Sequence, residues 1–226
     1  MIDIIIPAYL PTKHHHTMLL RALRSLEKQT YKDFGVIIVL NGCYVDYQKI
    51  IDSVNSCLDI SWLTIEGKAS GAIARNKGIH HSRKIYIAQL DADDQYHPNK
   101  LRKQIDFFKA YPKYSFVGTL ANDFISDTNI KNSCFKENQH RNHVDIARAL
   151  ANSNIMCHGS IMFKREAFVS LGGYNEKYKP GEYWPEYESK MWEDWDLWKR
   201  AIQNGYCFYN IPERLYYWST STGVER

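Results

Sequence analysis

The segment "KIYIAQLDADD", Lys84 to Asp94, constrains the fold more than any other stretch of the sequence. Its apolar first part is short, and such runs are typical of strands buried on both faces of a sheet. Three aspartates, Asp91, Asp93 and Asp94, then stand within four positions at the end of that run. The stretch Pro98–Tyr111 follows shortly after, and its pattern predicts a helix that begins with proline, as first turns of helices often do. The segment therefore predicts a buried strand that emerges in an acidic loop before a helix.

The same succession of strand and helix recurs three times nearer the N-terminus. Nearly continuous apolar strands that alternate with helices are the signature of a parallel sheet covered by helices on both faces. We therefore expect an α/β protein with a doubly wound, Rossmann-like, mainly parallel sheet. The predicted strands are Ile2–Pro7, Gly35–Asn41 and Ile60–Ile65, and the predicted helices are Met18–Gln29, Asp46–Ser56 and Ser70–His81.

The second half of the chain is less regular. A strand is expected near Ser115–Leu120, a short helix near Val144–Ala151, and a further strand at Gly159–Lys164. The pattern of Glu193–Gly205 predicts a helix that its C-terminal glycine closes. We expect residues 1–226 to form a single domain with two halves, 1–120 and 121–226.

The composition excludes several classes of protein. With 44% hydrophobic and 24% charged residues, the chain can bury a normal core. The net charge is only +4, and the lysines and arginines are spread along the sequence, so no nucleic-acid-binding surface is indicated. The five cysteines form no CxxC pair, so neither a zinc site nor a disulfide framework is indicated. Without a run of about 18 apolar residues or a signal peptide, we expect a cytoplasmic protein without a transmembrane segment.

Carboxylates at a strand end are suited to a divalent cation. Mg²⁺ and Mn²⁺ take oxygen ligands, commonly one or two carboxylates together with substrate phosphates. The alternative is that the aspartates cap the following helix, and the spacing alone does not decide between the two. The stretch Gly67–Gly78 adds Arg75 and Lys77 at a helix start, where either could bind phosphate. Neither GxGxxG nor GxxxxGK[ST] is present, which argues against a nicotinamide cofactor and a P-loop nucleotide.

The stretch "EYWPEYESKMWEDWD", Glu182 to Asp196, contains six acids and five aromatic residues. Aromatic faces beside carboxylates suit a sugar-binding surface, whereas a packed lid with solvated acids would give the same composition. Asp194, near the first turn of a predicted helix, is the residue expected to act as a catalytic base.

Five motifs, taken together and in order, resemble glycosyltransferase family 2. The resemblance spans Ile2 to about Gly205 and implies a GT-A fold and transfer of a sugar from a nucleotide donor with inversion. It also implies a nucleotide-binding first half and an acceptor-binding second half. The motifs are "IIIPAY", "SGAIARNKGI", "YIAQLDADD", "HGSIMFKREAFVSLGGYNE" and "WEDWDLWKRAIQNG".

The resemblance implies a role for each matching residue. Asp194 matches the general base, and Asp93 with Asp91 matches the ligands of Mn²⁺ or Mg²⁺. The nucleotide-binding residues would be Pro7, Ala8, Tyr9, Asn41, Arg75, Asp91 and Ala92. The residues near the donor and acceptor sugars would be His158, Gly159, Glu193, Trp192 and Trp195, with Tyr183 and Trp184 as further acceptor candidates.

The sequence departs from the family pattern in three places. The second strand commonly ends in paired aspartates, but here Leu40 and Asn41 stand there, and an asparagine can both accept and donate hydrogen bonds. No histidine follows His158, so none can serve as a late metal ligand. The QxxRW motif of processive synthases is absent, which favours addition of a single sugar. The run His14–His16 is expected in a solvated loop, with a catalytic or metal-binding role as the alternative.

Three functions compete at this point. The first is an inverting, metal-assisted glycosyltransferase that uses a UDP- or dTDP-sugar and a hydroxyl of a glycan or glycolipid. A lipid-linked acceptor would bring peripheral association with a membrane. The second is an inactive sugar-nucleotide-binding module of the same fold. The third, a nucleotidyltransferase, would normally have a loop rich in glycine and basic residues after the first strand, and "PAYLPTKHHH" contains no glycine.

Overall fold

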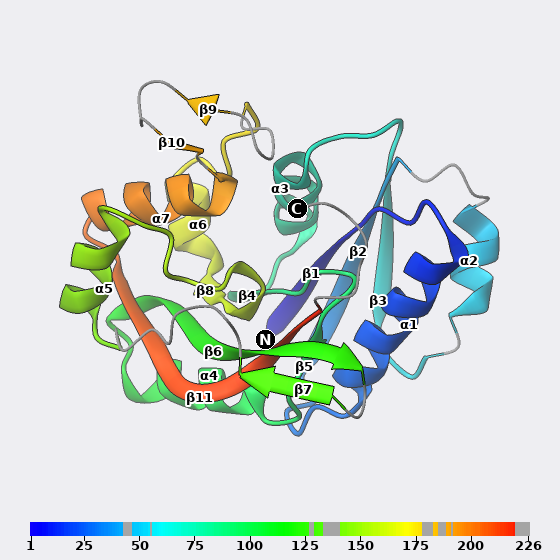
Figure 1. Ribbon diagram of the computed structural model, residues 1–226, viewed down its shortest axis with the longest axis horizontal. Coiled ribbons are helices and arrows are strands. Elements are labelled where there is room, and N and C mark those ends of the chain that lie inside the picture. The colour runs from blue at the N-terminus through cyan, green and yellow to red at the C-terminus, as the bar shows by residue number, and fades with distance from the viewer. Residues whose placement is uncertain are drawn as a thin grey trace.

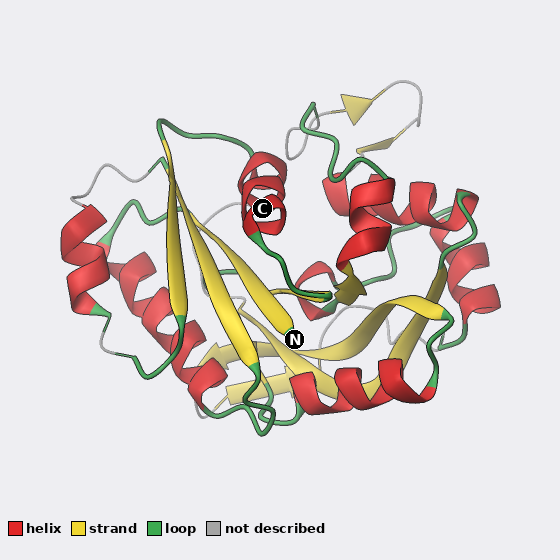
Figure 2. Ribbon diagram, turned by 180° about the vertical axis from the view of Figure 1, so that it is seen from behind, coloured by secondary structure: helices red, strands yellow, loops and turns green. Residues whose placement is uncertain are grey.

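The computed structural model describes residues 1–42, 47–54, 56–126, 129–132, 141–177, 183–184, 189–190 and 192–219. A curled mixed sheet forms its centre, with helices on both sides (Figures 1 and 2). The strand order is β3-β2-β1-β4-β8-β6-β11-β5, and β7 pairs with β6 outside this path. This arrangement confirms the expected α/β fold with a mainly parallel sheet.

The first half supplies the parallel side of the sheet. Strand β1 pairs in parallel with β2 and β4, and β2 pairs in parallel with β3. The strands β1 (Ile2–Ala8), β2 (Phe34–Asn41), β3 (Ile60–Ile65) and β4 (Tyr86–Gln89) alternate with the helices α1 (Lys13–Glu27), α2 (Tyr47–Ser53) and α3 (Gly71–His81). All four strands were expected, and their carboxyl ends lie along one edge.

The second half extends the same sheet without a break. The short strand β8 (Met162–Lys164) runs antiparallel between β4 and β6 (Tyr114–Ser126), and β6 pairs in parallel with β11 (Cys207–Ser219). Strand β6 crosses residue 120, where the two expected halves meet. The remaining elements are β5 (Gln95–Tyr96), α4 (Lys100–Ala110), β7 (Asn129–Asn132), α5 (His143–Leu150), α6 (Arg165–Ser170), β9 (Tyr183–Trp184), β10 (Ser189–Lys190) and α7 (Glu193–Gln203).

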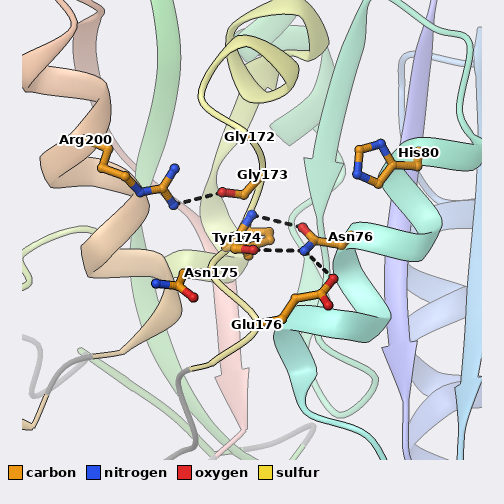
Figure 3. Close-up of a pocket in the computed structure, with 8 residues that line it drawn as sticks. All are labelled: Asn76, His80, Gly172, Gly173, Tyr174, Asn175, Glu176 and Arg200. Atoms are coloured by element: carbon orange, nitrogen blue, oxygen red, sulfur yellow. Dashed lines mark hydrogen bonds between the residues drawn. The ribbon is translucent and has the colours of Figure 1, made fainter. Parts of the chain in front are cut away.

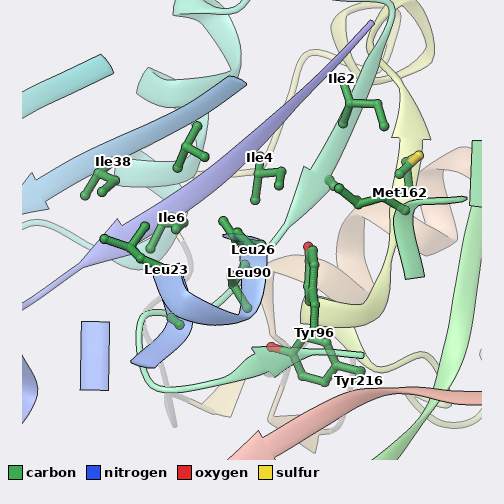
Figure 4. Packing of buried hydrophobic residues seen from close by; sticks show 14 of the residues in the cluster. Ile2, Ile4, Ile6, Leu23, Leu26, Ile38, Leu90, Tyr96, Met162 and Tyr216 are labelled. Carbon is green, nitrogen blue, oxygen red and sulfur yellow. The ribbon is translucent and has the colours of Figure 1, made fainter. Parts of the chain in front are cut away.

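The alternation of side chains along β1 divides the core between the two faces. Ile2, Ile4 and Ile6 pack with α1 and α4 on one face, and Ile5 packs with α3, α6 and α7 on the other. Successive strand residues point to opposite faces, so a strand buried on both sides needs apolar residues at successive positions. Figure 4 shows the first of these two clusters, in which Leu23 and Leu26 of α1 approach the isoleucines.

The start of one helix and the start of one strand differ clearly from the sequence prediction. Helix α1 begins at Lys13 instead of Met18, so His14–His16 lie in its first turns and the predicted loop is wrong there. The hydroxyl of Thr12, the residue before the helix, lies 2.8 Å from Nδ1 of His15. The strand expected at Gly159–Lys164 begins only at Met162, because His158–Ser160 form a 3₁₀ turn in which Ser160 Oγ donates to the Cys157 carbonyl at 2.8 Å.

Strand β11 was not predicted at all. Pro212, Glu213 and Arg214 interrupt its apolar pattern in the middle. The pairing with β6 shifts register between Ile211 and Arg214 and again before Tyr216. Such bulges are where a sheet accommodates proline, which cannot donate to the ladder. No described helix has both the length and the apolar composition that crossing a membrane requires.

Lys100 is an ionisable group inside the core at the start of α4. Its side chain is fully buried, Nζ donates to Gln104 Oε1 at 2.9 Å, and Nζ stands 3.9 Å from the centre of the Tyr96 ring. Burial lowers the pKa of Lys100 well below its ordinary value of 10.5, and the neighbouring Cys157 only partly opposes this. The native state therefore binds this proton less tightly than the unfolded chain does.

Replacing Lys100 with Met is expected to flatten the pH dependence of stability in the range below the ordinary lysine pKa of 10.5. In the wild type the unfolded chain keeps the lysine proton up to its ordinary pKa of 10.5, while the native state loses it at lower pH, so the free energy of unfolding rises with pH. Urea unfolding followed by circular dichroism at several pH values measures this slope. The control Lys103→Met, at a side chain 47% exposed on the same helix, keeps the wild-type slope. An undiminished slope in Lys100→Met would contradict the prediction.

Candidate active site

Arg75 forms the centre of the polar cluster at the carboxyl edge of the sheet. It lies in α3, and its guanidinium pairs with Asp91, which follows β4, at 2.7 Å and with Glu193, the first residue of α7, at 2.9 Å. Burial alone would lower the pKa of Arg75, but the carboxylates of Asp91 and Glu193 outweigh it and raise that pKa. A permanent positive charge therefore joins the loop after β4 to the start of α7.

Asp194 lies next to this ion pair, almost fully buried at 7% exposure. Its Oδ2 accepts a hydrogen bond from Asn154 Nδ2 at 2.8 Å, and its Oδ1 accepts one from the backbone N–H of Trp195 at 2.8 Å. Burial and the adjacent Glu193 carboxylate raise the pKa of Asp194 to about 7, against the opposing effects of Asn154, the Trp195 N–H and Arg75. A carboxylate with this pKa can take up and release a proton near neutral pH.

The three aspartates after β4 have three different surroundings. Asp94 is turned inward, where it accepts hydrogen bonds from Tyr216 Oη at 2.5 Å and from the backbone N–H of Ser219 at 2.7 Å. Asp91 binds Arg75, and the carbonyl of Asp93 accepts a hydrogen bond from Arg21 at 3.0 Å. Helix α4 has Asn99 as its N-cap and no acid in its first turn, so the helix-cap interpretation of these aspartates is wrong.

His158 is a neutral hydrogen-bonding group at the back of the cluster. Its Nε2 lies 2.8 Å from the hydroxyl of Tyr174. Burial and the nearby Arg75 lower the pKa of His158 to about 3, although Asp91 opposes this. Gly159 beside it has no room for a side chain, since a Cβ there would stand 1.9 Å from Tyr216 Oη. Packing against Tyr216 of β11 is therefore enough to explain why position 159 holds a glycine.

The residues expected to bind a nucleotide lie at the ends of β1 and β2. Pro7 and Ala8 end β1, and the ring of Tyr9 beyond them has Lys68 Nζ 4.6 Å from its centre. Asn41, at the end of β2, donates to the Ala69 carbonyl at 2.9 Å and accepts from the Ala69 N–H at 2.8 Å. Its amide thereby fixes the loop that leads into α3. Ala92 lies half-buried between the two aspartates.

The aromatic residues of the predicted sugar-binding stretch are placed differently from one another. Trp195 is 8% exposed, and its Nε1 donates to the carbonyl of Leu150 at 2.8 Å, which ties α7 to the end of α5. Its ring is therefore a packing element and not an open platform for a sugar. Trp192 is half-buried just before α7. Tyr183 and Trp184 form β9, and their side chains lie outside the described residues.

A depression of about 460 Å³ borders the cluster between α3, α7 and the turn after α6 (Figure 3). Asn76 holds this turn, because it accepts from the Tyr174 N–H and donates to the Tyr174 carbonyl, both at 2.9 Å. Arg200 donates to the carbonyl of Gly173 at 2.8 Å. The polar groups of the wall thus bond one another. His80 and Arg200 lie near the ends of their helices, away from Arg75 and Glu193.

A divalent cation would have Asp93 and Asp91 as its protein ligands. Among the described residues, no three His, Cys, Asp or Glu side chains gather into a ready metal site. Mg²⁺ and Mn²⁺ commonly need only one or two carboxylates when phosphates complete the shell. Asp94 is engaged by Tyr216 and Ser219, and Oδ1 of Asp91 by Arg75. The donor set therefore fits a cation that arrives with a diphosphate better than one held by protein alone.

Sequence reasoning assigned no role to three polar residues that hold the site together. Asn154 bonds to Asp194, the Tyr174 hydroxyl lies beside His158, and Asn76 bonds to the Tyr174 backbone. Asn76 and Tyr174 stand inside motifs that were singled out, whereas Asn154 stands in none. Asparagine is common in loops for conformational reasons, so its presence carries no signal for a site. Lys68 could have been suspected, because it lies in the glycine-rich stretch before α3.

Comparison with known proteins agrees with this geometry. The profile of the family described as "Glycosyl transferase family 2" matches residues 3–172. Glycosyltransferase EpsE of Bacillus subtilis is 26% identical over 200 residues, covering 88% of this chain and 66% of its own. An Escherichia coli relative named "UDP-Gal:alpha-D-GlcNAc-diphosphoundecaprenol beta-1,3-galactosyltransferase" is 25% identical over 195 residues, covering 86% of this chain and 66% of its own. The chain thus spans about two thirds of the length of both relatives.

Solved structures with the same fold come from two further transferases. Staphylococcus aureus TarS 1–349 in complex with UDP-GlcNAc has a TM-score of 0.73 at 17% identity, covering 99% of this chain and 59% of its own. The mannosyltransferase PcManGT of Pyrobaculum calidifontis, in complex with GDP-Man and Mn²⁺, has a TM-score of 0.67 at 16% identity, covering 96% of this chain and 56% of its own. These similarities confirm the expected GT-A fold.

Replacing Arg75 with Met is expected to lower the free energy of unfolding by about 3–5 kcal/mol, because the buried Glu193 carboxylate and the partly buried Asp91 carboxylate lose their counter-charge. Urea unfolding at neutral pH measures this loss. The double variant Arg75→Met/Glu193→Gln removes one of the two stranded charges and recovers part of it. The exposed residue Arg83, which follows α3, provides the matched control, and Arg83→Met changes stability by less than about 0.5 kcal/mol. An equally small effect at Arg75 would show that the bridge is not energetically important.

Proposed function

The chain belongs to glycosyltransferase family 2, and we propose that it transfers a single sugar from a nucleoside-diphosphate sugar to a hydroxyl of a glycan or glycolipid, with inversion at the anomeric carbon. The observation that carries the proposal is the position of Asp194. A buried carboxylate with a pKa of about 7 lies beside the Arg75 bridge to Asp91, at the edge of the sheet where ligands of this fold bind.

Asp194 is the proposed general base. At neutral pH the Asp194 carboxyl group is ionised in about half of the protein molecules. The ionised form can accept the proton of the acceptor hydroxyl as the new glycosidic bond forms. In-line attack by that hydroxyl opposite the leaving group inverts the anomeric centre. No covalent intermediate with the protein is needed, because the acceptor oxygen displaces the nucleoside diphosphate directly.

The groups on the other side of the cluster are suited to the departing nucleoside diphosphate. Arg75 carries a fixed positive charge, and Asp93 with Asp91 would hold Mn²⁺ or Mg²⁺. When bound, the cation supplies Lewis-acid stabilisation of the negative charge on the leaving group. Pro7, Ala8, Tyr9 and Asn41 would surround the base and ribose, and Lys68 is close enough to Tyr9 to contribute there. His158, Glu193 and Trp192 remain candidates for contacts with the sugars.

The donor and the acceptor are proposed from family membership together with these groups. A pyrimidine nucleotide, UDP or dTDP, is the proposed donor carrier, in line with TarS bound to UDP-GlcNAc. PcManGT bound to GDP-Man and Mn²⁺ supports the use of a divalent cation in this fold. The Escherichia coli relative, by its name, acts on a diphosphoundecaprenol acceptor, which supports a lipid-linked glycan as one acceptor class.

The variant Asp194→Asn is expected to lose transfer by a factor of about 10²–10⁴ while it keeps the nucleotide affinity of the wild type. Release of nucleoside diphosphate from a panel of UDP-, dTDP- and GDP-sugars measures transfer, and calorimetry measures affinity. The wild-type rate rises as the pH increases through about 7, because Asp194 must be ionised. Asp196→Asn, the same change two residues later in α7, retains transfer. Full activity of Asp194→Asn would exclude it as the base.

Binding of UDP or dTDP is expected to depend on a divalent cation. Calorimetric titration with UDP, dTDP, GDP and CDP is carried out with Mn²⁺ and then with EDTA, and one pyrimidine nucleotide is expected to bind at least tenfold more tightly with the metal. Asp93→Asn abolishes this gain and leaves the fold intact. Tight binding without any transfer in the wild type would favour the sugar-nucleotide-binding module. Binding that is indifferent to metal would remove the cation from the proposal.

A further inference from the structure

Asn154 reaches the proposed base from a different part of the chain. It lies in the loop between α5 and the 3₁₀ turn, and its Nδ2 donates to Asp194 Oδ2 at 2.8 Å. Its Oδ1 accepts a hydrogen bond from the Met156 N–H at 3.4 Å, which fixes the orientation of the amide. The start of this loop is fixed to α7, because the Trp195 indole N–H donates to the carbonyl of Leu150, the last residue of α5, at 2.8 Å.

The two oxygens of Asp194 are held by donors from two different elements. Oδ2 is held by the α5 loop through Asn154, and Oδ1 is held by α7 itself through the Trp195 N–H. With one donor on each oxygen, the carboxylate cannot rotate about its own axis, and its remaining lone pairs keep one direction. A base that must meet an acceptor hydroxyl at hydrogen-bond distance depends on such fixed orientation.

We propose that Asn154 is a positioning residue for the transfer reaction, which aligns Asp194 with the acceptor hydroxyl and favours the ionised form of that carboxylate. The inference rests on the proposed role of Asp194 as the base. Asn154 acts through Asp194 and need not touch either substrate. Its partly buried amide has its donor directed at the carboxylate, and no other element of the described chain supplies a side-chain hydrogen bond to Asp194.

The charges around Asp194 explain why one neutral donor matters. Glu193 on the same helix repels the negative charge of Asp194, and Arg75 of α3 attracts it. The buried Tyr174 hydroxyl is close enough to interact electrostatically with all three residues. A hydrogen bond to the charged form of an acid favours that form, so loss of the Asn154 donor raises the pKa of Asp194 further. An aspartate at position 154 raises it more, because a second negative charge then faces the first.

The direct test follows the titration of the Asp194 carboxyl by ¹³C NMR in protein labelled at aspartate, with Asp194→Asn for assignment. In Asn154→Ala the midpoint is expected to rise by about one pH unit, and in Asn154→Asp by more. The acid limb of the transfer rate moves by the same amount. Starting from a pKa of about 7, such a rise leaves about a tenth of Asp194 ionised at neutral pH, so the rate falls about fivefold there and largely recovers at alkaline pH.

Two controls separate this role from general damage to the fold. Asn152→Ala changes an exposed asparagine of the same loop and is expected to leave both the titration and the rate unchanged. The affinity for UDP with Mn²⁺, measured by calorimetry, stays at its wild-type value in Asn154→Ala. An unmoved Asp194 titration, or a rate lowered equally at every pH, would overturn the proposal. Full activity of Asp194→Asn would instead overturn the proposed base, whatever the titration in Asn154→Ala shows.

Discussion

The buried ion pairs of Arg75 with Asp91 and Glu193 join parts of the chain that are far apart in sequence. Asp91 follows the last parallel strand of the first half, and Glu193 begins the last helix of the second half, 118 residues after Arg75. A guanidinium with two carboxylates leaves one negative charge in excess, and removal of Arg75 leaves both carboxylates without their counter-charge. The bridge therefore fixes the distance between the loop after β4 and the start of α7, where the proposed metal ligands and the proposed base respectively lie.

Side-chain amides complete what the ion pairs begin. Asn41 binds both backbone groups of Ala69, and Asn76 binds both backbone groups of Tyr174, so the loop before α3 and the turn after α6 are held in the same way. Gln104 donates to the carbonyls of Val117 and Ser160 and fixes the turn that carries His158. Each amide satisfies backbone groups that a loop would otherwise leave unpaired in a buried place. The site is thus held in position by neutral groups before any ligand arrives.

The sequence predicted those parts of the fold in which apolar periodicity and burial coincide. The central strands β1 and β2 are mostly apolar because both of their faces are covered, and this pattern is visible without a structure. Helix α1 starts earlier than predicted, since its first turns from Lys13 to Thr17 are polar and carry no periodic signal. Strand β11 was missed because its ends are apolar but its middle holds Pro212 and two charges, which a change of register accommodates. Whether such a segment forms a strand depends on the strand it pairs with, and the local sequence does not reveal that partner.

The candidate site follows the same division. Asp91, Arg75, Glu193 and Asp194 were singled out because they stand in motifs that resemble those of the family, and the structure brings Arg75 to both Asp91 and Glu193. The departure at the end of β2 has an explanation that no motif could supply. Leu40 is fully buried in the core, so only Asn41 faces the site side of the strand. An aspartate at position 41 could accept from the Ala69 N–H but would repel the Ala69 carbonyl, whereas asparagine bonds to both. The amide edge used for Ala69 is then no longer available to a nucleobase. In the proposed function, recognition of the base would therefore rely more on the backbone at the end of β1 and on Tyr9 with Lys68 than on the end of β2.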